Sequence, residues 1–398
     1  MIKEQLGIYI HIPFCVKKCL YCDFLSFPSK DELKIDYVNR LLKEIQEETE
    51  KGDYKNHIVH TIFIGGGTPS ILESKEIDRI LCKLKQCFDM KEDAEITIEV
   101  NPGTVTKEKC KDYFSMGINR LSIGLQSANE EELKTLGRIH TYQDFLDTFY
   151  MARSIGYSNI NVDLMSALPG QTIQSWQNTL QKVIKLNVEH ISAYSLIIEE
   201  ETPFFEQYGV MNHKNIDEKT YPSLPDEDGE RSMYELTGKM LTESGYYPYE
   251  ISNYAKKGFE CKHNCAYWKR NDYIGFGIGS ASLIKNVRRS NIRELNVYVN
   301  QYLKEGVKKK KYVEPTSIQE LSLKEQMEEF MFLGLRMING VSKKDFFEIF
   351  HKNMREVYGT IIDDFLKKKL LIESGDQIKL SKKGVDLSNY VMAEFLLE

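Results

Sequence analysis

The stretch that decides the fold is residues 9–24, which read YIHIPFCVKKCLYCDF. Three cysteines, Cys15, Cys19 and Cys22, stand in it at C-x3-C-x2-C spacing, directly after an apolar run typical of a buried strand. Thiolates this close in the sequence can bind one metal cluster without long-range folding. We therefore expect a strand followed by a metal-binding loop.

The spacing of these cysteines differs from that of other common cysteine sites. A zinc ribbon or finger needs paired C-x2-4-C halves with a second pair of Cys or His ligands, and thioredoxin-type chemistry uses two cysteines. Iron–sulfur clusters are held by Cys thiolates, normally four of them. Three ligands would leave one iron with an open coordination position. We expect this open position to be part of the protein's function.

Composition is that of an ordinary soluble globular protein. The chain has 398 residues, 41% of them hydrophobic, enough for one large domain and a smaller one. Its net charge of −6 and isoelectric point near 5.9 argue against a nucleic-acid partner. No apolar run resembles a signal peptide or a membrane span. We expect a cytoplasmic protein, whose thiols bind metals or stay free.

Residues 6–200 alternate between strand-like and helix-like segments. The strand-like segments are rich in Ile and Val: Gly7–Ile12, His60–Ile64, Glu95–Val100, Arg120–Leu125, Asn159–Met165 and His190–Ile197. The helical segments between them are Lys34–Glu50, Ser74–Phe88, Lys107–Met116, Tyr142–Ser154 and Gln174–Lys185. Six β-α repeats predict an α/β fold with a parallel sheet, which could be doubly wound or a barrel.

Glycines and polar residues gather at or near the ends of these strands. They are Gly65–Pro69 (GGGTP), Glu99–Pro102 (EVNP), Gln126–Ser127, Asp163 and Tyr194. In both architectures functional sites lie at the C-terminal ends of the strands. Each of these residues alone could be a turn or a satisfied core group, but five at the same edge predict a site.

The alternation stops near residue 200. Residues 208–230 read as a long loop, and an aromatic, glycine-rich tract and the basic run Lys308–Lys311 follow. After Pro315 the pattern is helical and then forms a hairpin, Leu370–Glu373 with Gln377–Leu380. We expect domains at 1–200, 201–312 and 313–398, the last a small helical, winged-helix-like unit. Such units often bind DNA, but the acidic residues favour packing or partner binding.

Taken together, the motifs of residues 8–202 resemble those of the radical S-adenosylmethionine (SAM) superfamily, and within it the oxygen-independent coproporphyrinogen III oxidase-like family. The resemblance implies a partial six-stranded (β/α)6 TIM-like barrel, open on one side. It also implies a [4Fe-4S] cluster on Cys15, Cys19 and Cys22, with SAM bound to the fourth iron. The positions that match SAM-contacting motifs are Tyr9, Tyr21, Gly66, Gly67, Thr68, Glu99, Gln126, Arg138 and Asp163.

Residue 24 separates two branches of that family. The resemblance implies that the decarboxylating oxidases carry a further cysteine there, whereas this chain has Phe24, as is typical of the heme-chaperone branch. The run H-N-x-x-Y-W, with His263, Tyr267 and Trp268, resembles the heme-associated motif of that branch. His, Tyr and Cys are known heme ligands, and flat aromatic rings suit a porphyrin. The alternative for these residues is core packing around a structural histidine.

We therefore expect a heme chaperone that binds the [4Fe-4S] cluster, SAM and heme and passes heme to an acceptor protein. The acceptor would be a respiratory-chain hemoprotein, the electron donor a flavodoxin or ferredoxin, and any membrane contact would come through the partner. The alternative is an oxygen-independent coproporphyrinogen III oxidase, which decarboxylates propionates to vinyls by a radical route. A third, weaker interpretation is a DNA-associated redox regulator. Whether SAM is cleaved stays open.

Overall fold

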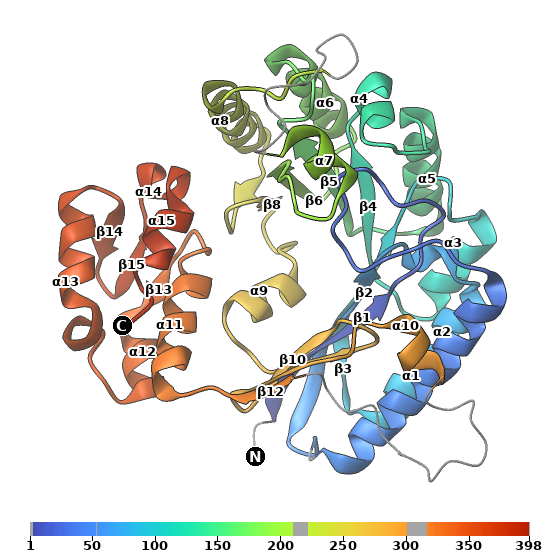
Figure 1. The fold of residues 1–398 in the computed structure, drawn as a ribbon, viewed down its shortest axis with the longest axis horizontal. Coiled ribbons are helices and arrows are strands. Elements are labelled where there is room, and N and C mark those ends of the chain that lie inside the picture. The colour runs from blue at the N-terminus through green and yellow to red at the C-terminus, as the bar shows by residue number, and fades with distance from the viewer. Residues whose placement is uncertain (1–2, 53, 210–221, 301–316, 398) are drawn as a thin grey trace.

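The computed structural model describes residues 3–52, 54–209, 222–300 and 317–397. Its largest feature is one curved sheet (Figure 1). Six parallel strands form the centre of this sheet: β1 (Glu4–Ile12), β2 (His57–Gly66), β3 (Met90–Val100), β4 (Arg120–Gln126), β5 (Ile160–Ser166) and β6 (His190–Ser195). They lie side by side in sequence order, whereas a doubly wound sheet reverses its order partway. The predicted α/β fold with a partial six-stranded barrel is confirmed.

The barrel stays open because other strands pair with both of its edges. β9 (Tyr273–Phe276) pairs in parallel with β1, and β8 (Asn253–Ala255) pairs antiparallel with β6. Beyond β9 the sheet continues through β10 (Ala281–Ile284), β11 (Val287–Ser290) and β12 (Ser317–Glu320), and beyond β8 through β7 (Tyr247–Pro248). In the described part of the chain, β1 and β6 therefore do not pair with each other.

Side chains of the six central strands alternate between two unlike faces. The convex face carries fully buried aliphatic residues, among them Ile8, Ile62, Ile98, Ile123 and Val162. The concave face carries polar side chains that bond to one another across strands, including Ser122, Asn161, Asp163 and His190. An ordinary closed barrel is filled by bulky apolar side chains. The polar concave face is thus the place where this fold differs and where a ligand site is expected.

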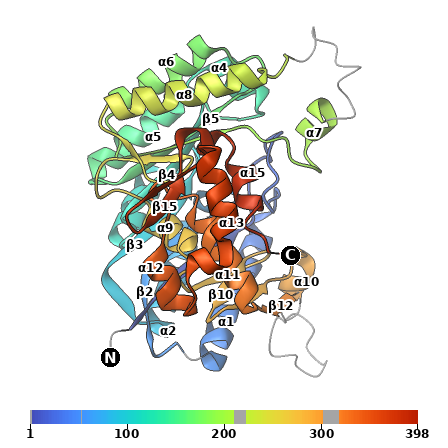
Figure 2. The ribbon, with the colours of Figure 1, turned by 90° about the vertical axis from the view of Figure 1, so that its left-hand side faces the viewer.

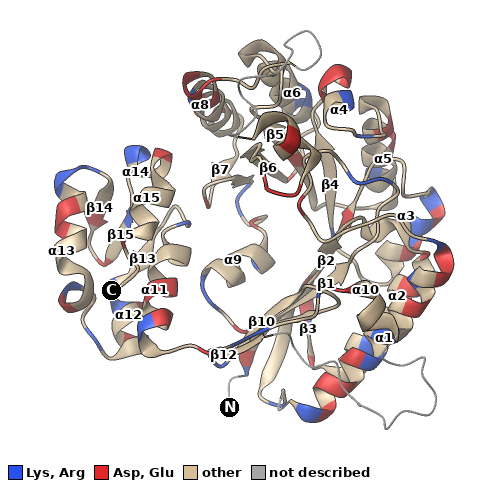
Figure 3. Cartoon of the chain, viewed as in Figure 1, with Lys and Arg blue, Asp and Glu red and all other residues tan. Residues whose placement is uncertain are grey.

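Helices cover the convex face, and Figure 3 shows their outer sides lined with acidic and basic residues. The long ones are α1 (Asp31–Lys51), α2 (Ser74–Cys87), α3 (Lys107–Ser115), α5 (Tyr142–Ile155) and α6 (Ile173–Lys185), all close to their predicted positions. Within residues 1–209, two short helices were not predicted: α4 (Glu130–Thr135) and α7 (Pro203–Tyr208). Each has six residues, too few for an amphipathic pattern to register in the sequence.

The middle of the chain builds the open side of the barrel. It contains α8 (Glu227–Glu243), α9 (Lys262–Trp268) and α10 (Leu295–Asn300). α9 lies against β1 and β2, between the sheet and the C-terminal domain (Figure 1). The predicted loop 208–230 falls partly, and the basic run Lys308–Lys311 wholly, outside the described residues.

The last part of the chain forms a separate small domain with its own apolar core (Figure 2). Its elements are α11 (Leu323–Gly334), β13 (Val341–Ser342), α12 (Lys343–Phe350), α13 (Met354–Lys367), β14 (Leu371–Ser374), β15 (Gln377–Leu380), α14 (Lys382–Asp386) and α15 (Ser388–Ala393). Three helices precede the predicted hairpin, as in a winged helix. β12, from the predicted domain 313–398, pairs with β11 in the large sheet instead.

Candidate functional site

The cysteine loop, residues 13–30, connects the C-terminal end of β1 to α1. Its backbone is fixed at three points: Cys15 N–H donates to the Phe27 carbonyl (3.1 Å), Leu20 N–H donates to the Leu136 carbonyl (3.1 Å), and Phe204 N–H donates to the Leu20 carbonyl (3.0 Å). Leu136 directly follows α4 and Phe204 lies in α7. The two short helices that sequence reasoning missed therefore hold the loop in place.

Two of the three thiols have polar neighbours that lie near the strand ends. Thr68 Oγ1 donates to Cys15 Sγ (3.5 Å), and Arg138 Nη1 donates to Cys19 Sγ (3.7 Å). The sulfurs of Cys15, Cys19 and Cys22 do not all lie within 4.8 Å of one another, as thiolates about 2.3 Å from one zinc ion would. Thiols are the donors that hold iron–sulfur clusters, so the chemistry of this donor set fits such a cluster.

The glycines after β2 allow the cysteine loop to approach the sheet. Gly66 has φ +115° and donates its N–H to Glu99 Oε2 (3.0 Å). A Cβ on Gly67 would lie 2.7 Å from the Phe14 carbonyl oxygen and 3.1 Å from Cys15 Sγ. Glycine is required at both positions, at Gly66 for its backbone conformation and at Gly67 for the close contact.

A pocket of about 350 Å³ opens beside Cys19, lined by Thr68, Asn101, Arg138 and neighbouring residues. Arg138 Nη2 donates to Asn101 Oδ1 (2.8 Å), and Asn101 Nδ2 donates to Thr68 Oγ1 (2.8 Å). This chain of bonds links the ends of three strands. Asn101 was not among the predicted site residues, although its position in the EVNP motif at a strand end was a usable signal.

Two half-buried carboxyl groups lie deeper on the concave face. Burial, and secondly the charge of Asp163, raise the pKa of Glu99 to about 8, so its carboxyl is mostly protonated at neutral pH. Burial also raises the pKa of Asp163, whose oxygens accept from Asn161 Nδ2 (2.7 Å) and Ser122 Oγ (3.2 Å). Two neighbouring carboxyl groups in a low-dielectric site repel each other when both are ionised, so they cannot both ionise freely. A cationic ligand would offset this repulsion, so the site suits such a ligand.

Three further predicted residues surround the same region. Tyr9 O–H donates to His11 Nδ1 (3.1 Å), while His11 Nε2 donates to the Leu25 carbonyl (2.8 Å), so this pair shapes the cysteine loop. Gln126 ends β4 with φ +69° and accepts a hydrogen bond from Tyr194 O–H (2.9 Å). The phenol of Tyr21 is buried beside Arg138, and burial raises its pKa. Backbone strain at a non-glycine residue such as Gln126 is often found at functional sites.

His263 lies on α9 and faces β1 and β2. Its Nδ1 bonds to Thr61 Oγ1 (2.9 Å), its ring lies 5.3 Å from that of Phe63, and Gly7 leaves space for it on β1. Burial, followed by the charge of Arg120, lowers its pKa to about 4. The imidazole is therefore neutral, and its Nε2 makes no hydrogen bond with any described residue. A neutral imidazole that is held by a hydrogen bond at one nitrogen can bind a metal ion through the other nitrogen.

The other two heme candidates point in different directions. Tyr267, one helical turn after His263, is 40% exposed, and its ring lies 5.0 Å from that of Tyr273 on β9. Trp268 lies under the guanidinium of Arg336, 4.5 Å from its ring centre, and so faces the C-terminal domain. The rings of Tyr267 and Trp268 also meet edge to face, with their centroids 5.2 Å apart.

The His263 region and the region of the predicted SAM residues are neighbours on the concave face. The Phe63 ring lies 6.3 Å from that of Tyr9 and 5.3 Å from that of His263. One aromatic side chain therefore spans the distance between Tyr9 and the imidazole of His263.

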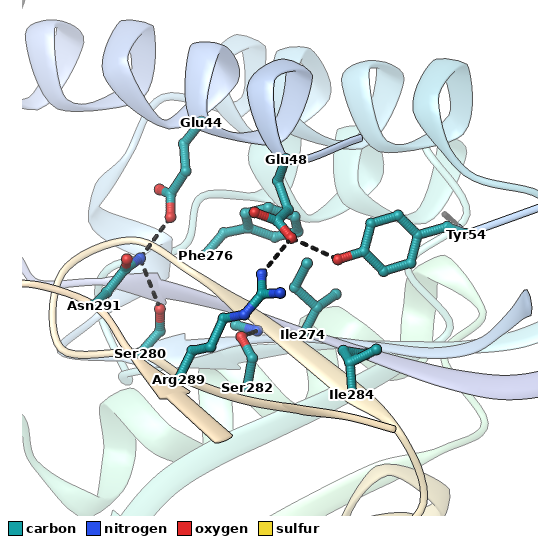
Figure 4. Close-up of a pocket in the computed structure, with 11 residues that line it drawn as sticks. Glu44, Glu48, Tyr54, Ile274, Phe276, Ser280, Ser282, Ile284, Arg289 and Asn291 are labelled. Carbon is teal, nitrogen blue, oxygen red and sulfur yellow. Dashed lines mark hydrogen bonds and ion pairs between the residues drawn. The ribbon is translucent and has the colours of Figure 1, made fainter. Parts of the chain in front are cut away.

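A second pocket, of about 430 Å³, lies between α1 and β9–β11 (Figure 4). Glu48 Oε1 accepts hydrogen bonds from Tyr54 (2.6 Å) and Arg289 (3.0 Å), and Glu44 Oε1 accepts one from Asn291 (2.5 Å). The polar groups of this pocket bond to each other and join α1 to the added strands. None of the predicted site residues lines it, so we interpret it as structural.

Comparisons with known proteins identify the class. The family model for the radical SAM superfamily matches residues 9–183, and that for the HemN C-terminal domain matches residues 321–387. In structure the chain is similar to coproporphyrinogen III oxidase (HemN) from Escherichia coli, with a TM-score of 0.83, 23% identity, and coverage of 100% of this chain and 91% of that one. The fold and the three-cysteine loop are thus those of a radical SAM protein, a class whose cofactors are a [4Fe-4S] cluster and SAM.

The particular family follows from closer relatives. The chain is 35% identical to the heme chaperone HemW of Lactococcus lactis over 399 residues, covering 100% of this chain and 99% of the relative. It is 34% identical to heme chaperone HemW of Escherichia coli over 394 residues, covering 99% and 98%. The chain belongs to the HemW family, as its motifs predicted. Among the described residues, no helix combines the length and apolar character needed to cross a bilayer.

Proposed function

We propose that this chain is a heme chaperone, which holds a [4Fe-4S] cluster, SAM and heme and passes the heme to an acceptor protein. The names of its full-length relatives support this function. The observation that carries it is His263: its Nδ1 is fixed by Thr61, and its Nε2 makes no hydrogen bond with any described residue. Tyr267 offers a flat ring to a porphyrin, and Trp268, whose ring contacts that of Tyr267, is the other aromatic candidate.

The cluster and SAM are assigned to the strand ends. Cys15, Cys19 and Cys22 would ligate three irons. SAM would take the fourth, with its sulfonium group among the acidic and aromatic side chains and its amino-acid end at the glycine loop. The residues proposed for SAM are Tyr9, Tyr21, Gly66, Gly67, Thr68, Glu99, Gln126, Arg138 and Asp163. Bound together, cluster and SAM supply one-electron chemistry, but carrying heme does not require that SAM be cleaved.

Phe24 argues against the alternative, coproporphyrinogen decarboxylation. Its side chain is 61% exposed and offers no thiol where the resemblance implies a further cysteine for the oxidases. Its carbonyl accepts a bond from Lys18 Nζ (3.0 Å), which fixes the end of the loop. We propose a respiratory-chain hemoprotein as the acceptor, reached from the cytoplasm, and a flavodoxin or ferredoxin as the electron donor.

Titration with heme tests this function. The purified, cluster-reconstituted protein should show a saturable Soret band with one heme per chain, and His263→Ala should shift the band and weaken binding at least tenfold, since a metal–ligand bond is lost. His351→Asn is the matched control. His351 is exposed and has φ +51°, a conformation that Asn tolerates, so its removal should leave the titration unchanged.

A second assay separates the two activities. Anaerobic incubation with dithionite, SAM and coproporphyrinogen III should yield no protoporphyrinogen. Formation of that product would favour the oxidase, and the absence of any saturable heme spectrum would reject the chaperone.

A further inference from the structure

Arg120 is a buried cation to which the site described above assigns no role. It is the first residue of β4, is 2% exposed, and pairs in register with Thr97 of β3. It shares its face with Ser122, which bonds to Asp163, and therefore points to the concave side. Its Nε is enclosed without a partner, and within the described residues the guanidinium makes no hydrogen bond or ion pair.

The charged and polar groups around Arg120 are already engaged elsewhere. Glu95 accepts the N–H groups of Lys262 and His263 (both 3.2 Å) and the thiol of Cys261 (3.7 Å). The carboxylate of Asp163 is taken by Asn161 and Ser122. On the adjoining strand, His190 bonds to Asn161 (2.5 Å) and to the Tyr249 hydroxyl (2.8 Å), which leaves neither ring nitrogen available.

Glu95 and Asp163 lie near enough to favour the charge of Arg120, but neither forms an ion pair with it, and a buried guanidinium without hydrogen-bond partners is costly. The planar fork of Arg matches a carboxylate in two parallel hydrogen bonds, and such bonds are among the strongest in proteins. The arrangement is therefore that of an anion site whose anion comes with a ligand.

The position of Arg120 indicates which ligand carries that anion. Glu95 contacts the backbone of His263, and both Glu95 and His263 lie within electrostatic reach of Arg120. Glu99 and Asp163 of the proposed SAM set also lie within electrostatic reach of Arg120. The carboxylate of SAM, however, is assigned to the glycine loop at the C-terminal ends of the strands, and β4 runs seven residues from Arg120 to that end, roughly 20 Å at the rise of a strand. The anion thus belongs to the molecule that reaches His263.

We propose that Arg120 binds a propionate carboxylate of the porphyrin whose iron is ligated by His263. This inference rests on the proposed heme-chaperone function and adds an orientation to it. The propionate edge enters the barrel first, toward the N-terminal ends of the strands, and the opposite edge points outward. The ligand class is a metal tetrapyrrole with free carboxylates, and a neutral porphyrin of the same shape is discriminated against.

The test compares heme with its dimethyl ester, in which both propionates are blocked and the iron is unchanged. Binding of each is followed by the Soret band in the native protein and in Arg120→Gln, Arg120→Lys and Arg231→Gln. Arg231 is an exposed arginine of α8 and serves as the matched control. We expect the native protein and Arg231→Gln to bind heme at least tenfold more tightly than the ester. Arg120→Gln should abolish this preference by weakening heme alone, with the Soret position unchanged, and Arg120→Lys should restore part of it.

Each outcome decides the proposal. Equal affinity of the native protein for heme and ester would overturn the role of Arg120 while leaving heme binding intact. A preference that survives in Arg120→Gln would also overturn it. If the native protein binds neither porphyrin, the chaperone function itself fails, and this inference fails with it. If Arg120→Gln does not fold, the comparison of heme with its dimethyl ester in the native protein and in Arg120→Lys still decides the proposal.

Discussion

Gly67 shows how tightly the cysteine loop packs against the end of β2. Its N–H donates to the Ile12 carbonyl (2.9 Å), and Thr68 N–H donates to the Phe14 carbonyl (2.8 Å). These two bonds align the strand end with the segment that carries Cys15. The backbone here cannot yield to a larger residue without moving a proposed cluster ligand.

Gly67→Ala should lower the iron and sulfide content of the reconstituted protein. The added Cβ would lie 2.7 Å from the Phe14 oxygen, and overpacking of this kind costs about 1–3 kcal/mol. Metal analysis and absorption near 400 nm measure the effect. Gly359→Ala is the control, because Gly359 lies in α13 with open space around it, and alanine in a helix gains roughly 0.5–1 kcal/mol. Equal iron content in both variants would show that the close contact does not matter.

The residues at the strand ends could be predicted from sequence motifs, because runs of glycine and polar residues there are local signals. Asn101 and Arg120 were missed for opposite reasons. Asn101 precedes a proline and looks like a turn residue, although its amide lies between Thr68 and Arg138. Arg120 looks like the polar start of a strand, and nothing local in the sequence indicates that its side chain is buried.

At the scale of elements, α9 is positioned by Glu95 of β3. The helix has seven residues, and its N-cap residue, Cys261, makes no side-chain capping bond. Glu95 supplies the missing acceptor across the barrel, for the N–H groups of Lys262 and His263. The direction of His263 therefore depends on a residue far from it in sequence.

Glu95→Ala should destabilise the protein and weaken heme binding with His263 still present. The variant leaves two backbone N–H groups without their acceptor, which costs roughly 1–3 kcal/mol when such groups are buried. Urea denaturation followed by circular dichroism, together with the heme titration, measures both effects. Glu92→Ala, at an exposed position of the same strand, should change neither. Unaltered heme affinity in Glu95→Ala would show that α9 is held by other contacts.

The alternation of strands and long helices was predictable because hydrophobic periodicity is local. The short helices α4 and α7 and the strands β7 to β12 were not, since each has at most six residues and is stabilised by tertiary contacts. The Ile and Val residues of the strands form one aliphatic face, but the concave face is polar. The division into two faces depends on which side chains the barrel encloses. The positions of the strands in the sequence do not reveal this.

For the molecule as a whole, the C-terminal domain is joined to the barrel through buried charges. Glu329 of α11 accepts from Arg270 Nε (2.9 Å) and from Arg288 Nη1 (2.6 Å). Ile338 N–H donates to the Tyr249 carbonyl (3.0 Å), and Arg336 covers Trp268. These contacts reach the strands and the helix next to His263, so the domain forms one side of the proposed heme region.

Glu329→Gln should loosen this junction. It leaves Arg270, whose side chain is 7% exposed, without a counter-charge, and breaking a buried ion pair by removing one partner costs about 3–5 kcal/mol. Differential scanning calorimetry should show a lower melting temperature, or two transitions in place of one. In the control, Glu348→Gln removes an exposed pair with Lys344, a change worth about 0–1 kcal/mol. A melting curve like that of the native protein would mean that the domain is held by its apolar contacts.

The pairing of β1 with β9 has a consequence for the order in which the protein assembles during synthesis. The backbone hydrogen bonds of Cys15 and Leu20 need partners only up to Phe204, whereas β1 gains its second neighbour only when Tyr273–Phe276 has emerged. At the usual rate of translation, the second event follows the first by roughly ten seconds. A nascent chain would thus have its iron–sulfur ligands in place before it could hold its cargo.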